Sequence, residues 1–357
     1  MNIFVEKYCF VEKIKVTLSM NEKDMGERKV KYNFVVFATY AKLYKYMWQE
    51  LKDINNAKVF WDKEELLENL SFLEKLLAKI HLNKSINKLV HLPLKKIWYF
   101  LGAQKIRFDD NRPICFVWHN HYWTEIENGM VEYLRKVFPK SKHVYFFTDP
   151  WMVKKDKIEF LKKKMDIVSV FDPTIAEKYG LNYYPNIYPN KKFKDAPELE
   201  YDVFFIGTEK GRKKELHALY EVCKKNSIKA AFYIGKYENE GDEREGIHYI
   251  QNKIDYVDVV ELTRKSKCIL ELKVEPDCSC SLRVQEAVIL NKLLLTNNSN
   301  VYKMPLCENS KHIVCYSKPE DIDWSFLDTY SEVEFRYQGE YSAKKWIERI
   351  EEDLENK

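Results

Sequence analysis

The sequence lacks an apolar run of the roughly 18 residues that a membrane-spanning helix needs. Its first residues are charged at Glu6, Lys7 and Glu12, so no secretory signal peptide is expected. We therefore predict a cytoplasmic protein, attached at most peripherally to the cytoplasmic face of a membrane.

A strong excess of charge of one sign is also lacking. The chain carries 59 basic and 55 acidic residues, a formal net charge of +4. A protein that coats nucleic acid is usually far more basic, so no nucleic acid partner is expected.

Metal-binding motifs are the third absence. None of the eight cysteines has the C-x2-C spacing of a zinc site, and they are expected to be reduced thiols. Cys278 and Cys280 fit either a redox pair or an ordinary loop of small residues. No Asp-x-Asp motif stands where it would hold a metal, so neither a metal nor a cofactor is predicted.

Buried strands alternate with helical segments along most of the 357 residues. This alternation is typical of parallel sheets, and the chain is long enough for two domains. Residues 180–197, rich in Tyr, Pro, Asn and Lys, interrupt the alternation like a connection between domains. We predict Rossmann-like domains over 1–190 and 191–340, facing a central cleft, and an amphipathic helix over 341–357 that packs back on the first. The expected strands are 32–38, 58–61, 113–118, 143–147, 167–171, 202–206, 230–234, 248–250, 268–270, 293–296 and 313–316.

Residues 63–101 form a basic, helical part of the first domain. Lysines 84, 88, 95 and 96 alternate there with apolar and aromatic residues. This pattern fits a surface that contacts anionic lipid head groups, but we favour the alternative of a packed helical pair with solvated lysines.

Lys267–Asn298 has the pattern strand, polar loop, helix, strand. Ligands bind at the carboxyl ends of such strands, where Ser281, Arg283 and Glu286 stand. Arg283 and Glu286 share a helical face, because they are three residues apart. Glu286 is suited to accept the two hydroxyls of a ribose; the alternative is an intrahelical ion pair with Arg283.

A second strand-to-helix turn, Gly207–Arg212, offers features that suit an anion. Gly207 and Gly211 allow close approach of the backbone, and the helix that follows presents free N–H groups. Arg212 can bind phosphate through two hydrogen bonds. The spacing is not that of a P-loop, and the chain also lacks G-x-G-x-x-G after its first strand. Two such turns favour a nucleotide diphosphate as the ligand.

Three segments, YDVFFIGTEKGR, KSKCILEL and SLRVQEAVILNKLLLTNN, resemble the carboxyl-terminal domain of GT-B-fold glycosyltransferases of bacterial capsule and lipopolysaccharide synthesis. The segments FFTDP and FDPTIAEKYGLNYYPNIY extend the resemblance over roughly residues 110–320. It implies a GT-B-like α/β fold with the sugar donor in the second domain and the acceptor at the first. It also implies that Glu286 contacts the ribose, while Arg212 and Arg283 contact the diphosphate.

The chain departs from this family at one position. Many retaining members carry two glutamates separated by seven residues, and Cys278 stands where the first would precede Glu286. The departure favours inversion, unless Glu275 substitutes from elsewhere in the loop. Inversion needs a general base, for which His119 and Asp149 at strand ends of the first domain are the candidates. Their structural alternatives are a cap or packed ring and a turn before Pro150.

We thus predict a glycosyltransferase that moves a sugar from a nucleotide-diphosphate donor to a glycan or lipid-linked glycan acceptor in surface polysaccharide synthesis. Two alternatives remain open. One is a non-catalytic nucleotide- or nucleic-acid-binding protein, and the other is a hydrolysing sugar-nucleotide epimerase on the same fold.

Overall fold

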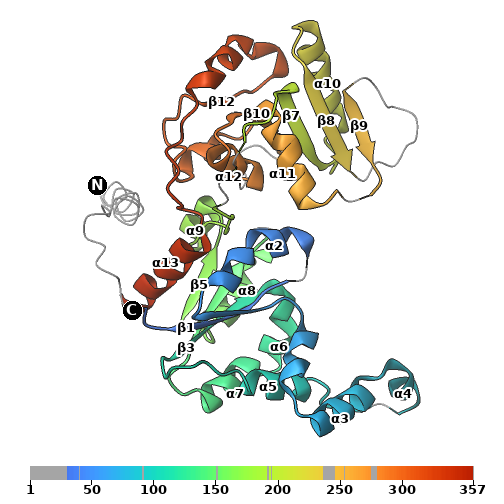
Figure 1. The fold of residues 1–357 in the computed structure, drawn as a ribbon, viewed down its shortest axis with the longest axis vertical. Helices are drawn as coiled ribbons and strands as arrows, with labels where there is room; N and C mark the ends of the chain where they lie inside the picture. The colour runs from blue at the N-terminus through green and yellow to red at the C-terminus, as the bar shows by residue number, and fades with distance from the viewer. Residues whose placement is uncertain are drawn as a thin grey trace.

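The computed structural model describes residues 30–39, 41–90, 92–149, 152–190, 193, 195–235, 246–252, 254–274 and 280–356. Two domains lie one above the other, the first in blue to green and the second in yellow to orange (Figure 1). The predicted roles of Glu275 and Cys278, and the possible pairing of Cys278 with Cys280, fall outside the described residues.

The first domain is built on a parallel six-stranded sheet in the order β2-β1-β3-β4-β5-β6. Its central strands are continuous apolar runs, such as Asn33-Phe-Val-Val-Phe37, whose side chains are buried on both faces. The strands are β1 (Asn33–Phe37), β2 (Ala57–Phe60), β3 (Ile114–His119), β4 (Lys142–Phe147), β5 (Ile167–Val170) and β6 (Asn182–Tyr183).

Helices connect these strands. The helical segment after β3 is divided in two, because Gly129 has φ of +88°, a left-handed conformation that ends α6 and starts α7. The α-helices are α2 (Lys42–Met47), α3 (Phe72–Leu82), α4 (Lys84–Leu89), α5 (Ile97–Gln104), α6 (Trp123–Glu127), α7 (Met130–Val137), α8 (Lys155–Lys162) and α9 (Pro173–Tyr179). The 3-10 helices are η2 (Gln49–Asp53), η3 (Lys63–Asn69) and η4 (Asn120–Tyr122).

The second domain has its own parallel six-stranded sheet, in the order β12-β11-β10-β7-β8-β9. Its strands are β7 (Tyr201–Thr208), β8 (Ala230–Gly235), β9 (Ile247–Ile250), β10 (Ser266–Glu271), β11 (Leu293–Thr296) and β12 (Ile313–Cys315). Its helices are α10 (Lys213–Lys225), α11 (Tyr256–Arg264), α12 (Leu282–Ile289) and the 3-10 helices η6 (Ser299–Lys303), η7 (Pro319–Asp321) and η8 (Trp324–Glu332).

The connection between the domains is more ordered than the composition of residues 180–197 suggests. It contributes edge strand β6 to the first sheet, and Tyr184, Ile187 and Tyr188 beyond it are buried. The aromatic residues of this connection therefore fill the core shared by the two domains, rather than belonging to an exposed loop.

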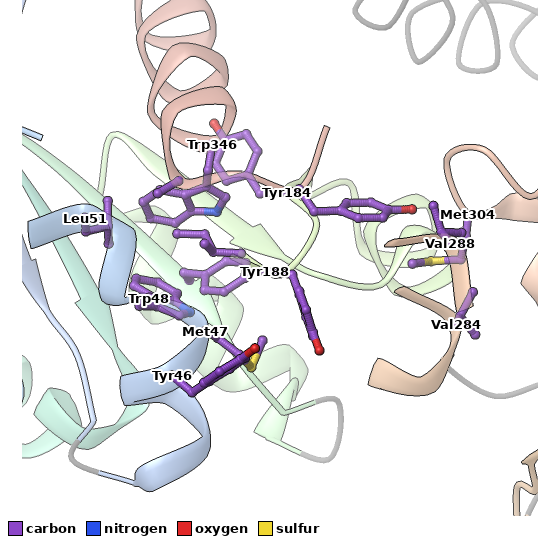
Figure 2. Packing of buried hydrophobic residues seen from close by; sticks show 14 of the residues in the cluster. Tyr46, Met47, Trp48, Leu51, Tyr184, Tyr188, Val284, Val288, Met304 and Trp346 are labelled. Atoms are coloured by element: carbon purple, nitrogen blue, oxygen red, sulfur yellow. The ribbon is translucent and has the colours of Figure 1, made fainter. Parts of the chain in front are cut away.

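The last helix, α13 (Ala343–Glu355), returns to the first domain (Figure 1). Its Trp346 packs against Trp48, with ring centroids 5.0 Å apart, and the Asp353 carboxylate accepts hydrogen bonds from Asn182 and Tyr184, each at 2.7 Å. Figure 2 shows Trp346 above Trp48, with Val284, Val288 and Met304 on the side of the second domain.

Direct contacts join the domains on the side of α2. The Lys42 amine lies 2.6 Å from the Asp255 carboxylate, and the rings of Tyr46 and Tyr256 are 5.1 Å apart. Gln285 of α12 donates to the Asn186 carbonyl oxygen at 2.8 Å, in a buried position. The two parallel sheets thus face each other across a packed interface.

Candidate active site between the two domains

Both sheets have a point where the strand order reverses, and ligands bind at the carboxyl ends of the strands there. In the second domain the chain runs from β7 outward to β9 and then returns to β10, on the other side of β7. The loops that follow β7 and β10 begin side by side at that point. In the first domain the reversal lies between β1 and β3, next to His119.

The turn after β7 is shaped by two consecutive left-handed residues, Lys210 with φ of +46° and Gly211 with φ of +80°. The Arg212 guanidinium donates to the carbonyl oxygens of Thr208 at 2.6 Å and of Leu272 beyond β10. Arg212 therefore ties the two loops together. Burial lowers its pKa, but the side chain stays charged, because the ordinary arginine pKa is far above neutrality.

Gly207 leaves room for this arginine. A Cβ atom there would stand 3.5 Å from an Arg212 guanidinium nitrogen and 3.1 Å from the Phe205 ring. Among the described residues, no side chain caps the start of α10, a helix of 13 residues. The positive end of the helix dipole there favours an anion.

The start of α12 is occupied differently. Glu271, buried at the end of β10, accepts a hydrogen bond from the Ser281 backbone N–H at 2.5 Å and from the Thr296 hydroxyl at 2.7 Å. Asp172 of the first domain accepts from the Cys280 N–H at 3.3 Å and also caps α9. Two carboxylates therefore cover this helix start, which makes it less suited to phosphate than the start of α10.

Ser281 serves as the N-cap of α12, since its hydroxyl accepts from the Arg283 N–H at 3.3 Å. The Arg283 guanidinium donates to the Glu286 carboxylate within the same helix, so the ion pair named as the alternative is present. The second oxygen of Glu286 accepts from the Tyr256 hydroxyl. Glu286 is 0% exposed and Arg283 keeps 16% of its side-chain surface.

This burial governs the titration of Glu286. Desolvation raises the pKa of the carboxyl, while Arg283 and the Tyr256 hydroxyl act in the opposite direction. The rings of Tyr46, Tyr188 and Tyr256 lie within 6.4 Å of one another beside it. A ribose can reach Glu286 only if Tyr256 gives up its hydrogen bond and this aromatic cluster opens.

Asp149 follows the end of β4 and is half-buried. Thr148 before it is held by Asn120, whose amide donates to the Thr148 hydroxyl at 3.0 Å, and by Tyr44, whose hydroxyl donates to the Thr148 carbonyl oxygen at 3.3 Å. Burial raises the pKa of Asp149, and the charge of Lys210 in the second domain opposes this rise. Asp149 thus stands at the carboxyl edge of the first sheet, and Lys210 is the charged group of the second domain that acts on its pKa.

His119 is placed less accessibly. Its ring is fully buried, edge-on to Trp48 at 4.4 Å and to Tyr44 at 5.4 Å between centroids. Neither ring nitrogen has a hydrogen-bond partner among the described residues. Burial lowers the pKa of His119 to about 3, so the ring is neutral near pH 7. A sugar acceptor could contact the ring only if Tyr44 or Trp48 moves.

Three residues that shape the site are not among the sequence candidates: Glu271, Asp172 and Tyr256. Glu271 and Asp172 each follow an apolar strand segment closely, and a carboxylate at a strand end is a signal that could have found them. Tyr256 has no comparable signal, because its link to Glu286 spans 30 residues.

Within the described ranges, no group of three or more His, Cys, Asp or Glu side chains is arranged to hold a metal ion. No helix in the same ranges has the length and apolar character needed to span a bilayer.

No protein-family model matches the chain, and no curated protein sequence matches it either. Among solved structures, it is similar to an alpha-glucosyltransferase in complex with UDP and a 13-mer DNA, with a TM-score of 0.50 and 12% identity over 91% of this chain and 99% of that chain. A structure of trehalose-6-phosphate synthase matches with a TM-score of 0.49, and a UDP-forming trehalose-phosphate synthase from Burkholderia xenovorans with 0.47. Both have 12% identity and the same coverages. The two parallel six-stranded sheets and the similarity to the alpha-glucosyltransferase structure confirm the predicted GT-B-like class with two Rossmann-like domains.

Proposed function

We propose that the chain is a glycosyltransferase that moves a sugar from a nucleotide-diphosphate donor to an acceptor held by the first domain. The observation that carries the proposal is the turn after β7, where Gly211 and Arg212 stand beside the reversal of strand order in the second sheet, at the start of α10. In the first domain the half-buried carboxylate of Asp149 follows β4, and the charge of Lys210 in that turn acts on its pKa. A base and an anion site on opposite sides of one interface suit group transfer from a phosphorylated donor.

In this proposal the diphosphate lies at the start of α10. Gly207 and Gly211 let the backbone approach it, and Arg212 adds positive charge while holding the two loops in register. Ser281 fixes the first turn of α12. Arg283 and Glu286 bind the diphosphate and the ribose once the cluster of Tyr46, Tyr188 and Tyr256 opens.

Asp149 is the proposed general base, since its raised pKa brings it closer to neutrality than an ordinary aspartate. His119 is the second candidate and requires exposure of its ring. The base assignment rests on inversion at the anomeric carbon, which the anomeric proton couplings of the product check directly by nuclear magnetic resonance.

We propose a glycan or lipid-linked glycan as the acceptor, and surface polysaccharide synthesis of the bacterial capsule or lipopolysaccharide type as the setting. The support is the resemblance of the segments around Gly207 and Glu286 to such enzymes. Neither a metal nor a nucleic acid partner is part of the proposal.

The decisive test is incubation of the full chain with a panel of UDP- and GDP-sugars, with and without glycan acceptors, followed by measurement of released nucleotide. Release that depends on an acceptor is expected. Release without any acceptor would instead indicate a hydrolysing epimerase. Calorimetric binding of nucleotide without turnover across the panel would indicate a nucleotide-binding protein and contradict the proposed transfer.

A further inference from the structure

One segment of the first domain concentrates apolar side chains on its surface. Ten of the fourteen exposed large apolar residues in the described part of the chain lie between positions 72 and 97, and we call them the α3–α4 surface. Phe72, Leu89 and Leu94 are 81%, 87% and 81% exposed. The ten are Phe72, Leu73, Leu76, Leu77, Ile80, Ile86, Leu89, Val90, Leu94 and Ile97. The packed helical pair considered for this region would have buried them.

The helix α3 contributes half of the residues of this surface. Its exposed apolar residues recur at spacings of three and four, so they share one face. Ala78, on the opposite face, is buried toward the domain. In Figure 1, α3 and α4 project from the first domain on the side away from the second domain. The apolar face of α3 is therefore directed outward.

Hydrogen bonds hold in place the remaining part of the α3–α4 surface, which lies in and after α4. The Asn83 side chain caps α4 by accepting from the N–H groups of Ser85 and Ile86 at 2.9 and 3.1 Å. His81 of α3 accepts from the Trp98 indole at 2.9 Å and contacts the Pro93 carbonyl oxygen at 2.8 Å with its other nitrogen. These bonds link α3 to both ends of the segment that carries Leu89 and Leu94.

Within the segment that carries this surface the charge is almost entirely positive, although Glu64 and Glu68 of η3 line a pocket beside Lys75 and Lys79. Between residues 70 and 100 the only acidic residue is Glu74, and it pairs with Lys105. The basic residues are Lys75, Lys79, Lys84, Lys88, Lys95 and Lys96. An apolar helical face bordered by lysines is the composition that inserts into the head-group region of anionic bilayers. A second copy of the same surface would bring these lysines against one another, which disfavours a symmetric dimer here.

We infer that the α3–α4 surface docks the protein on a membrane that contains anionic lipids. The apolar residues enter the head-group region, and the lysines contact lipid phosphates. The inference depends only on exposure and charge, so it stands or falls separately from the proposed sugar transfer.

The test is sedimentation of the full chain with vesicles of phosphatidylcholine, with and without phosphatidylglycerol, in the absence of any sugar donor. Wild type is expected to bind the anionic vesicles and to be released by salt, which screens the lysines. The double variant Leu89→Ser/Leu94→Ser should bind about ten-fold more weakly or worse. Lys84→Glu/Lys88→Glu should lose about 25-fold or more, since each lysine contributes about five-fold.

The matched control is Val30→Ser/Leu199→Ser, which removes two exposed apolar side chains outside the α3–α4 surface and should bind like wild type. Circular dichroism confirms that each variant is folded. Failure of folded wild type to bind anionic vesicles at low salt would overturn the inference. So would equal binding by wild type and Leu89→Ser/Leu94→Ser, or a concentration-dependent dimer that only this variant abolishes.

Discussion

The pair of Arg283 and Glu286 admits a test that separates a structural ion pair from a ligand site. Its carboxylate is fully buried and has only two partners among the described side chains, Arg283 and Tyr256. Arg283→Met leaves that buried carboxylate without its counter-charge, a loss that typically costs about 3–5 kcal/mol. The double variant Arg283→Met/Glu286→Leu removes both charges and should recover most of this stability.

Ligand binding is expected to follow a different pattern. If Glu286 accepts ribose hydroxyls, each hydrogen bond to its charged oxygens is worth about 1.5–3 kcal/mol. The stable double variant should then bind UDP or GDP at least about ten-fold more weakly than wild type, because a loss of about 1.4 kcal/mol is tenfold. In the double variant we therefore expect the free energy of unfolding to recover, and the affinity for UDP or GDP to remain low.

The first assay is urea unfolding followed by tryptophan fluorescence, and the second is calorimetry with UDP and GDP. Burial raises the folded-state pKa of Glu286, and Arg283 is the first group that opposes the rise. A carboxyl with a raised folded-state pKa contributes stability at low pH and loses it as the pH rises. Arg283→Met should therefore be least destabilised in acid. Unchanged nucleotide affinity in the folded double variant would refute the ligand role, and a cost below about 1 kcal/mol for Arg283→Met would refute the buried pair.

Three further predictions concern other parts of the fold. Asp149→Asn should lower kcat of sugar transfer by about 100-fold or more and leave nucleotide affinity unchanged. The acid limb of the pH–rate profile of wild type should lie above the ordinary aspartate pKa of 3.8. An equal loss of nucleotide affinity in the variant would contradict the role of Asp149 as general base. Trp346→Ala should lower the free energy of unfolding by about 3–5 kcal/mol in a urea titration, against little change for the exposed Lys344→Ala on the same helix. Burial lowers the pKa of Lys292 from 10.5 to about 8. Between these pH values the unfolded chain binds one more proton than the folded chain, so the free energy of unfolding of wild type should rise by up to about 3 kcal/mol relative to Lys292→Met as the pH increases. Parallel stability profiles of the two proteins against pH would contradict the buried charge.

The strands other than β6 were predictable from sequence because their signal is local. Runs such as residues 33–37 and 293–296 are almost entirely apolar, and a strand covered on both faces is typical of such a run. The turn at Gly207–Arg212 was likewise visible, since glycines between an apolar strand and a basic helix start indicate a tight turn. The break between α6 and α7 has no decisive sequence signal, because Gly129 inside a periodic pattern is compatible with both one helix and two.

The candidate site was predictable only as a set of strand ends. That Arg283 and Glu286 share a helical face follows from a spacing of three residues. Whether the carboxylate is open to a ligand depends on Tyr256 of another helix, which donates to it, and on Tyr188 of the connection between the domains, whose ring packs against Tyr256. Only the tertiary structure brings these segments together.

Two further features also depend on the tertiary structure alone. One is the contact of Asp172 with the Cys280 N–H, across 108 residues, and the other is the exposure of Leu89 and Leu94. Sequence by itself determined which segments form strands and helices and where polar groups stand at strand ends, since periodicity and turn chemistry act over a few residues. Tertiary structure alone decided which of those groups are buried, paired or exposed, because burial is set by the neighbours that the fold supplies.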